Sequence, residues 1–187
     1  RLAYLSTDIK NQALANIAND IVARKSEILA ANKIDYTEAR ASGMNEAMLD
    51  RLLLNTSCLE GIARDVRSVA ALPDPVGEVF DMSTLPNGLL IGRKRVPLGV
   101  IGVIYESRPN VTVDISVLCL KSGNAVILRG GREAIHSNLA LAAVIQKAAS
   151  RAGVPDGAVQ YIENTDRDLV NHLLKMNDVI DLLIPRG

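Results

Sequence analysis

Arginines at the ends of apolar runs are the residues whose types and spacing could do chemistry in this sequence. One apolar run ends in Arg129-Gly130-Gly131-Arg132, directly before a helical segment. Glycines let backbone N–H groups approach a ligand, the start of a helix attracts negative charge, and guanidinium groups pair with phosphate. The stretch therefore predicts an anion-binding loop, with a glycine turn and solvated arginines as the alternative.

Two further apolar runs also end in polar residues. The first leads into the stretch Tyr105-Glu106-Ser107-Arg108-Pro109-Asn110, and the second into Pro185-Arg186-Gly187. Arg108 stands where a parallel sheet presents binding or catalytic groups. The alternative for this arginine is a structural ion pair with Glu106.

The elements that must position these residues follow from the spacing of apolar side chains after residue 97. Strands are expected at 100–105, 124–129, 159–162 and 179–184, and helices at 111–122, 135–151 and 165–176. Strict alternation of strand and helix predicts an α/β fold, with a Rossmann-like parallel sheet and helices on both of its faces. Because ligands bind beyond the carboxyl ends of such strands, the three polar stretches are expected at one edge.

The preceding residues predict a helical N-terminal segment over 1–72, with Ser6-Thr7-Asp8 offering capping oxygens. A short helix is expected at 45–54, and another is expected to begin near Ser57, because Ser57 and Glu60 match a capping box. Residues 73–97 predict a β-hairpin, with strands at 76–80 and 89–96 around the turn Pro86-Asn87-Gly88. The second strand carries charges, so it is expected to be an edge strand or to pair with another subunit. Residues 98–187 are then expected to form a Rossmann-like domain, which carries the predicted anion-binding loop.

Composition excludes several classes of protein. Lys plus Arg and Asp plus Glu both number 21 in 187 residues, so the basic excess of a nucleic-acid-binding protein is absent. No apolar run approaches the roughly 20 residues that span a membrane. Two cysteines cannot form a disulfide framework, which indicates a reducing, cytoplasmic location.

The sequence offers no convincing catalytic nucleophile, acid, base or metal site. Cys119 lies on the apolar stripe of its helix and is expected to fill the core, while Cys58 lies in the first turn of another helix without a nearby histidine. His136 and His172 lack a metal-binding partner at helical spacing. The last expected strand is not followed by a covering helix, so the sequence is expected to continue beyond Gly187.

Three stretches carry a resemblance to a known family. Residues 95–112 read RVPLGVIGVIYESRPNVT, residues 118–131 read LCLKSGNAVILRGG, and residues 183–187 read LIPRG. The chain resembles the γ-glutamyl phosphate reductases of the aldehyde dehydrogenase superfamily over essentially its whole length. The resemblance implies an aldehyde dehydrogenase-like fold. It also implies NADPH-dependent reduction of L-glutamyl 5-phosphate to L-glutamate 5-semialdehyde, with release of phosphate, in proline biosynthesis.

The resemblance also assigns roles to residues. The family's cysteine, which forms a thioacyl enzyme, lies downstream of the part matched here, so no catalytic residue is expected in this chain. Arg108 or Asn110 corresponds to the oxyanion position, and the two alternatives remain open. Arg129 matches a lysine that reaches the adenosine ribose, and Arg132 is suited to the 2′-phosphate of NADP. The residues expected to bind cofactor are Tyr105, Glu106, Ser107, Arg129, Gly130, Gly131, Arg132, Pro185, Arg186 and Gly187.

Partners follow from the same resemblance. The charged strand over 91–96 is similar to an oligomerisation hairpin, so a homo-oligomer is expected, with glutamate 5-kinase as a candidate partner. Two other functions remain open: the reductase portion of a bifunctional pyrroline-5-carboxylate synthase, and a non-catalytic nucleotide-binding module. A general aldehyde dehydrogenase is disfavoured by Arg108 and Gly130-Gly131.

Overall fold

A four-stranded parallel sheet supports the second half of the chain in the computed structural model, which describes residues 1–166 and 168–186. Its strands are β3 (Val100–Tyr105), β4 (Ala125–Arg129), β5 (Val159–Tyr161) and β6 (Leu182–Arg186). The strand order is β5-β4-β3-β6, and every neighbouring pair is parallel. The parallel sheet predicted from the sequence is therefore confirmed.

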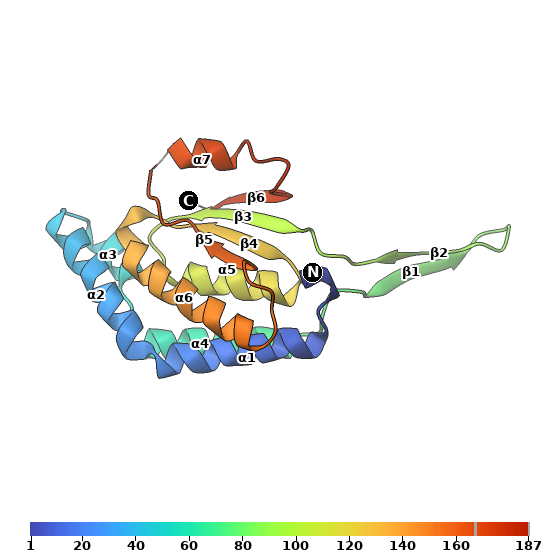
Figure 1. Ribbon diagram of the computed structural model, residues 1–187, viewed down its shortest axis with the longest axis horizontal. Helices are drawn as coiled ribbons and strands as arrows, with labels where there is room; N and C mark the ends of the chain where they lie inside the picture. Colours follow the sequence, from blue (N-terminus) through green and yellow to red (C-terminus); the bar gives the residue numbers. More distant parts are fainter. Residues whose placement is uncertain (167, 187) are drawn as a thin grey trace.

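Helices cover both faces of this sheet, as predicted. Helices α5 (Asn110–Lys121) and α6 (Ile135–Arg151) lie against one face, and the short helix α7 (Asp168–Leu173) lies over the other (Figure 1). The turn after α5 depends on Gly123, whose φ of +75° favours a residue without a side chain. A Cβ at this position would also lie 2.9 Å from the ring of Pro97, so the turn packs tightly.

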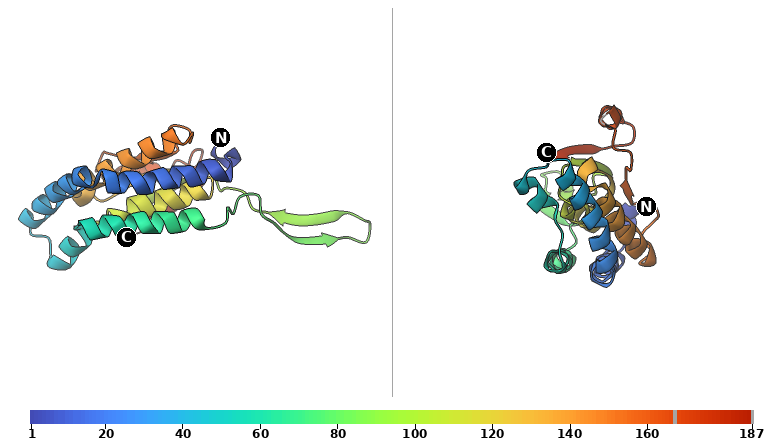
Figure 2. Two further views of the ribbon diagram at one scale, coloured as in Figure 1. Left: turned by 90° about the horizontal axis from the view of Figure 1, so that it is seen from below. Right: turned by 90° about the vertical axis from the view of Figure 1, so that its left-hand side faces the viewer.

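The first and last of the N-terminal helices form a further layer beneath α5 and α6, and the two between them lie at the left-hand end of the molecule (Figures 1 and 2). The N-terminal helices are α1 (Thr7–Ala23), α2 (Lys25–Ala41), α3 (Glu46–Leu52) and α4 (Thr56–Ala71), with short 3-10 turns η1 (Leu2–Tyr4) and η2 (Arg132–Ala134). Buried side chains of α1, such as Leu14 and Ile21, share one hydrophobic core with Leu128 and Ile145 of the sheet layer and α6. Residues 1–72 therefore pack on the Rossmann-like part through a common core. None of the described helices is both long and apolar enough to span a membrane.

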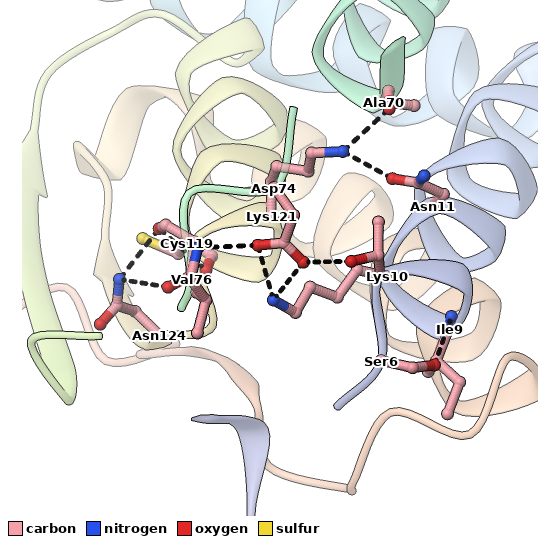
Figure 3. A network of polar contacts seen from close by, with 12 residues as sticks. Ser6, Ile9, Lys10, Asn11, Ala70, Asp74, Val76, Cys119, Lys121 and Asn124 are labelled. Atoms are coloured by element: carbon pink, nitrogen blue, oxygen red, sulfur yellow. Dashed lines mark hydrogen bonds and ion pairs between the residues drawn. The ribbon is translucent and has the colours of Figure 1, made fainter. Parts of the chain in front are cut away.

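A two-stranded antiparallel hairpin, β1 (Val79–Thr84) and β2 (Leu90–Lys94), projects from the body (Figures 1 and 2). Its base is anchored by Asp74, whose carboxylate accepts hydrogen bonds from Lys10 Nζ at 2.8 Å, from the Thr7 hydroxyl at 2.8 Å and from the Val76 N–H at 3.0 Å (Figure 3). Lys10 is only 1% exposed. The direction in which the hairpin leaves the body is thus held by a buried ion pair.

Electrostatics at the hairpin base involve one carboxylate and two buried lysines. Burial raises the pKa of Asp74, but the hydrogen bonds from Lys10, Val76 and Thr7 and the charge of Lys10 outweigh it, so the net pKa is lowered. Burial lowers the pKa of Lys121, whose ammonium group donates to Asn11 Oδ1 and the Ala70 carbonyl (Figure 3). This cluster ties α1, α4 and α5 to the start of the hairpin.

One predicted helix cap and the bounds of three predicted elements are wrong, each because a side chain or a turn competes with the pattern. Strand β2 is also shorter than predicted, Leu90–Lys94 instead of 89–96. Helix α4 begins at Thr56, because the Asn55 side chain accepts from the Cys58 N–H; Ser57 lies inside the helix and forms no capping box. Strand β1 is Val79–Thr84 instead of 76–80, because Asp74 binds the Val76 N–H and Gly77 turns with a φ of +90°.

The other two differences lie near the C-terminus. Helix α7 covers Asp168–Leu173 instead of 165–176, and the side chain of Asp166 accepts a hydrogen bond from the Asp168 N–H at its start. Strand β6 is Leu182–Arg186 instead of 179–184, because the N–H groups of Val179 and Ile180 bond back to the Met176 carbonyl in a turn. Pro185 fits in β6 because this strand lies at the edge of the described sheet.

Candidate functional site

Two adjoining grooves lie at the carboxyl ends of β3, β4 and β6. The larger has a volume of about 480 Å³ and the smaller of about 210 Å³. The residues lining both are Met48, Tyr105, Glu106, Ser107 and Arg186. The grooves therefore form one crevice, at the point where the strand order reverses between β3 and β6, which is where open α/β sheets bind ligands.

Arg129 and Arg132 both line the larger groove, as the sequence predicts. Arg129 Nη2 donates a hydrogen bond to the Thr165 carbonyl at 3.0 Å, while its buried Nε has no hydrogen-bond partner among the described residues. The side chain of Arg132 is exposed. One guanidinium group is thus fixed at the wall of the groove, and the other is available to an entering anion.

Gly131 is covered by a carboxylate of the protein itself. The Glu133 side chain folds back so closely that a Cβ on Gly131 would overlap it, and Glu133 Oε1 accepts a hydrogen bond from the Ser107 hydroxyl at 2.6 Å. Ser107 is buried, so its hydroxyl is committed to this contact. The loop therefore presents a carboxylate to the same groove that Arg129 and Arg132 line, a feature that the sequence pattern did not indicate.

Gly130 is required by packing behind the groove. A Cβ at this position would lie 2.3 Å from Asn138 Nδ2 and 3.0 Å from the Tyr161 hydroxyl. Asn138 Nδ2 donates to that hydroxyl, and Asn138 Oδ1 accepts from Thr112, which also bonds to the Tyr105 hydroxyl at 2.6 Å. Burial raises the pKa of Tyr105, so its phenol stays protonated. The Tyr105 ring lines the crevice, but its polar end belongs to this buried network.

The start of α6 does not face a ligand, so this part of the sequence prediction is wrong. The carboxylate of Asp35, on α2, accepts hydrogen bonds from the backbone N–H groups of His136 at 3.1 Å and Ser137 at 2.7 Å. Asp35 is 2% exposed and also contacts the His136 ring at 2.8 Å. Because this carboxylate already satisfies the helix start, a ligand phosphate has no open N–H groups there.

The structure separates the two candidates for the oxyanion position. Arg108 lines the smaller groove with its side chain exposed. Asn110 is not among the residues lining either groove, and its amide donates to Asp114 at 3.1 Å. Burial raises the pKa of that carboxyl group. Of the two alternatives, only Arg108 lies at the crevice.

The remaining predicted site residues come from the end of the sequence. Pro185 and Arg186 line the crevice at the carboxyl end of β6. Gly187 lies outside the described residues. Glu106 lines both grooves and is exposed, and no ion pair joins it to Arg108 among the described residues, although the Arg108 N–H donates to the Glu106 carbonyl.

Sequence reasoning missed the contribution of the N-terminal helices. The crevice is also lined by Ser42 and Met44, from the connection after α2, and by Met48 and Arg51, from α3. Their local pattern is that of an ordinary surface helix. Only the packing of α2 against α6 and η2 brings them to the ends of the strands.

Neither cysteine lies at the crevice. Cys119 is buried, and burial raises its pKa to about 12, which agrees with its predicted role as core filling. Cys58 is exposed on α4 and lines neither groove. No cluster of metal-ligating side chains occurs in the part of the chain that the structure describes.

Comparisons with known proteins agree with this architecture. Residues 5–183 match the model of the aldehyde dehydrogenase family. A γ-glutamyl phosphate reductase of Dehalococcoides mccartyi is 65% identical over 186 residues, which are the whole of this chain and 44% of that protein. The chain therefore spans less than half the length of this curated relative.

Solved structures show the same relationship. The crystal structure of γ-glutamyl phosphate reductase from Thermotoga maritima matches with a TM-score of 0.96 and 45% identity, over 100% of this chain and 45% of that one. The Saccharomyces cerevisiae enzyme matches with a TM-score of 0.91 and 36% identity, over 100% of this chain and 47% of that one. The resemblance and the fold inferred from the sequence motifs are confirmed.

Proposed function

The chain belongs to the aldehyde dehydrogenase family, and from this premise we propose that it is the cofactor-binding part of an enzyme that reduces L-glutamyl 5-phosphate. The product is L-glutamate 5-semialdehyde, phosphate is released, and the reaction serves proline biosynthesis. The observation that carries the proposal is 65% identity, over the whole chain, to a γ-glutamyl phosphate reductase. Because the chain covers 44% of that relative, the activity is proposed for the complete enzyme.

The crevice fits a nicotinamide dinucleotide, which supplies a hydride when it is bound. Arg129 has a buried, unpartnered Nε within the described residues, and Arg132 is exposed beside it. We assign the adenosine ribose to Arg129, and the 2′-phosphate that distinguishes NADP from NAD to Arg132. A planar guanidinium pairs bidentately with a phosphate, and each charged hydrogen bond is worth about 1.5–3 kcal/mol.

The position of Asp35 limits where the pyrophosphate can lie. Its carboxylate binds the first N–H groups of α6, so the pyrophosphate is not assigned to that helix start. We assign it to the part of the larger groove beside Pro185, at the end of β6. Glu133 faces the same groove and is suited to accept hydrogen bonds from ribose hydroxyl groups.

Arg108 is assigned to the substrate. The positive charge of an arginine suits an acyl-phosphate substrate better than the neutral side-chain amide of an asparagine does, because the phosphate and the developing oxyanion are both negatively charged. Its exposure in the smaller groove supports this role, whereas the amide of Asn110 is bound to Asp114. The nucleophilic thiol is assigned to the part of the relatives that this chain does not cover, because Cys58 and Cys119 both lie away from the crevice.

We further propose that the enzyme is a cytoplasmic homo-oligomer, with glutamate 5-kinase as a candidate partner. The hairpin carries exposed apolar side chains, among them Val79, Leu89, Leu90 and Ile91. An isolated two-stranded hairpin is marginally stable in water, so one that projects from the body gains stability from a second subunit. Two unpaired cysteines are compatible with a reducing compartment.

The reverse reaction of the full-length enzyme tests the function. Glutamate 5-semialdehyde and NADP⁺ are supplied with and without inorganic phosphate, and formation of NADPH is followed. We expect NADPH only when phosphate is present, because phosphate must resolve the acyl intermediate. Formation of NADPH without phosphate would instead indicate a hydrolytic aldehyde dehydrogenase, and no reaction in either case would reject the proposal.

A further inference from the structure

Three arginines from distant parts of the sequence line the smaller groove. Arg51 comes from α3, Arg108 from the loop after β3, and Arg186 from the end of β6. The other residues of the lining are Met48, Tyr105, Glu106, Ser107 and Val111. The groove is therefore a basic site to which the N-terminal helices contribute directly.

The positive charge of this lining is not balanced by the described protein. Within residues 1–166 and 168–186, none of the three arginines forms an ion pair, and the one carboxylate in the lining is Glu106. Burial raises the pKa of Asp114 on α5, and the charge of Arg186 lowers it by a smaller amount. Three positive charges that line one groove repel one another, so a ligand with two negative charges would stabilise the groove.

Arg51 is held in place by the residues on either side of it. Leu49 and Leu52 are buried in a small cluster with Ala39 of α2 and Ala134 of η2. The end of α3 is fixed by Asn32, whose amide donates to the Leu52 carbonyl at 2.8 Å and whose Oδ1 accepts from the Leu54 N–H at 2.8 Å. The backbone of Arg51 is thus anchored, while its side chain is exposed at the groove.

The dimensions of the groove favour a small anion. A volume of about 210 Å³ lies below the roughly 300–1,000 Å³ of sites that enclose drug-sized ligands. Guanidinium groups recognise phosphate oxygens in pairs, and three of them can contact a phosphate from several sides. Arg129 and Arg132 do not line this groove, because they belong to the lining of the larger one.

We propose that Arg51, Arg108 and Arg186 form a site for a phosphate dianion, namely the phosphate of the acyl-phosphate substrate and the inorganic phosphate released from it. This assignment rests on the proposed function and extends it, because it makes Arg51 a substrate-binding residue. The pyrophosphate of the dinucleotide is the other source of the same chemistry. The two sources are separated by measuring each ligand alone.

The test uses the full-length enzyme with Arg51→Gln, and Arg64→Gln as the matched control. Arg64 is an exposed arginine of α4 that lines neither groove. Binding of inorganic phosphate and of NADP⁺ is measured by calorimetry, and KM and kcat are measured for the acyl phosphate. Thermal unfolding of both variants checks that the fold is intact.

Loss of one charged contact is expected to weaken phosphate binding and raise the KM for the acyl phosphate about tenfold or more in Arg51→Gln. The NADP⁺ affinity of Arg51→Gln should stay within about twofold of that of the enzyme without a substitution. Arg64→Gln should match the enzyme without a substitution in all of these quantities. Three results would overturn the proposal. Arg51→Gln could bind phosphate as tightly as the enzyme without a substitution, or it could lose affinity for NADP⁺ alone. The enzyme without a substitution could also fail to bind phosphate.

The outcomes also separate this site from the proposed function. If the enzyme reduces the acyl phosphate, but its phosphate affinity and its KM for the acyl phosphate do not depend on Arg51, the proposed function holds and the phosphate site is rejected. If phosphate binding depends on Arg51 but the enzyme does not reduce the acyl phosphate, the phosphate site holds and the proposed function is rejected.

Discussion

The carboxylate of Asp35 accepts a hydrogen bond from the backbone N–H of Ser137 at 2.7 Å, across 102 residues of sequence. The same carboxylate binds the His136 N–H and the Ser137 hydroxyl, so it caps α6 from another helix. The contact joins α2, which leads to Arg51, to the loop that carries Arg132. It therefore fixes the two walls of the crevice relative to one another.

Asp35→Ala is expected to lower the free energy of unfolding by about 2–3 kcal/mol, because it removes a helix cap and leaves buried N–H groups unpaired. Urea denaturation monitored by circular dichroism measures the change. Glu38→Gln, at an exposed position of the same helix, serves as the control and should stay within about 0.5 kcal/mol. Equal stability of the two variants would show that the cap contributes nothing.

Gly130→Ala and Gly131→Ala are expected to differ in stability, although neither glycine has a positive φ. The new Cβ of Gly130→Ala would displace the buried Asn138 amide, at a cost of about 1–3 kcal/mol. At Gly131 it would displace the end of the flexible Glu133 side chain at the groove, so the cost should be limited to the hydrogen bond that Glu133 accepts from the Ser107 hydroxyl, about 1 kcal/mol. Thermal denaturation of the two variants decides the point, and the reverse order would contradict the packing described.

Asp74→Asn is expected to cost about 3 kcal/mol at neutral pH, because it leaves the buried ammonium group of Lys10 without a counter-charge. The folded-state pKa of Asp74 lies below its ordinary value of 3.8, so its carboxylate stabilises the fold above that value. This contribution disappears as the pH falls through the lower, folded-state pKa.

The stability difference between the unchanged protein and Asp74→Asn should therefore shrink as the pH falls below about 4. Urea denaturation at a series of pH values measures it. Asp178→Asn, at an exposed position, serves as the control and should show no comparable trend. A difference that is constant with pH would refute the role of the ion pair.

Arg132→Ala is expected to weaken NADPH binding about tenfold or more and to leave NADH binding nearly unchanged, because only NADPH carries the 2′-phosphate. Fluorescence titration of the full-length enzyme with each cofactor measures both affinities. An equal loss for the two cofactors would mean that Arg132 contacts a group that they share.

Leu90→Glu is expected to reduce the molar mass of the full-length enzyme in solution, because it places a charge on the exposed apolar hairpin. Light scattering coupled to size-exclusion chromatography measures the mass. The matched control is Leu174→Glu, a similarly exposed leucine outside the hairpin. A mass unaffected by Leu90→Glu would argue against an interface at this strand.

Local patterns in the sequence determined the parallel sheet and the edge at which the crevice lies. Strand β3 was predicted with its observed bounds, because a continuous apolar run between Pro97 and the polar residues after Tyr105 has no competing structure. The arginines at strand ends, Arg129 and Arg186, could be placed at the crevice for the same reason. Their position follows from the direction of the strands alone.

Tertiary structure alone decided what surrounds these arginines. Whether the start of α6 is open to a ligand depends on Asp35, and whether a groove closes over Arg108 depends on Arg51, both from helices far away in sequence. A helix pattern shows which face is apolar, but it does not show which distant element that face meets. Contacts between elements are set by packing of the whole core, and for that reason the N-terminal residues that line the crevice could not be predicted.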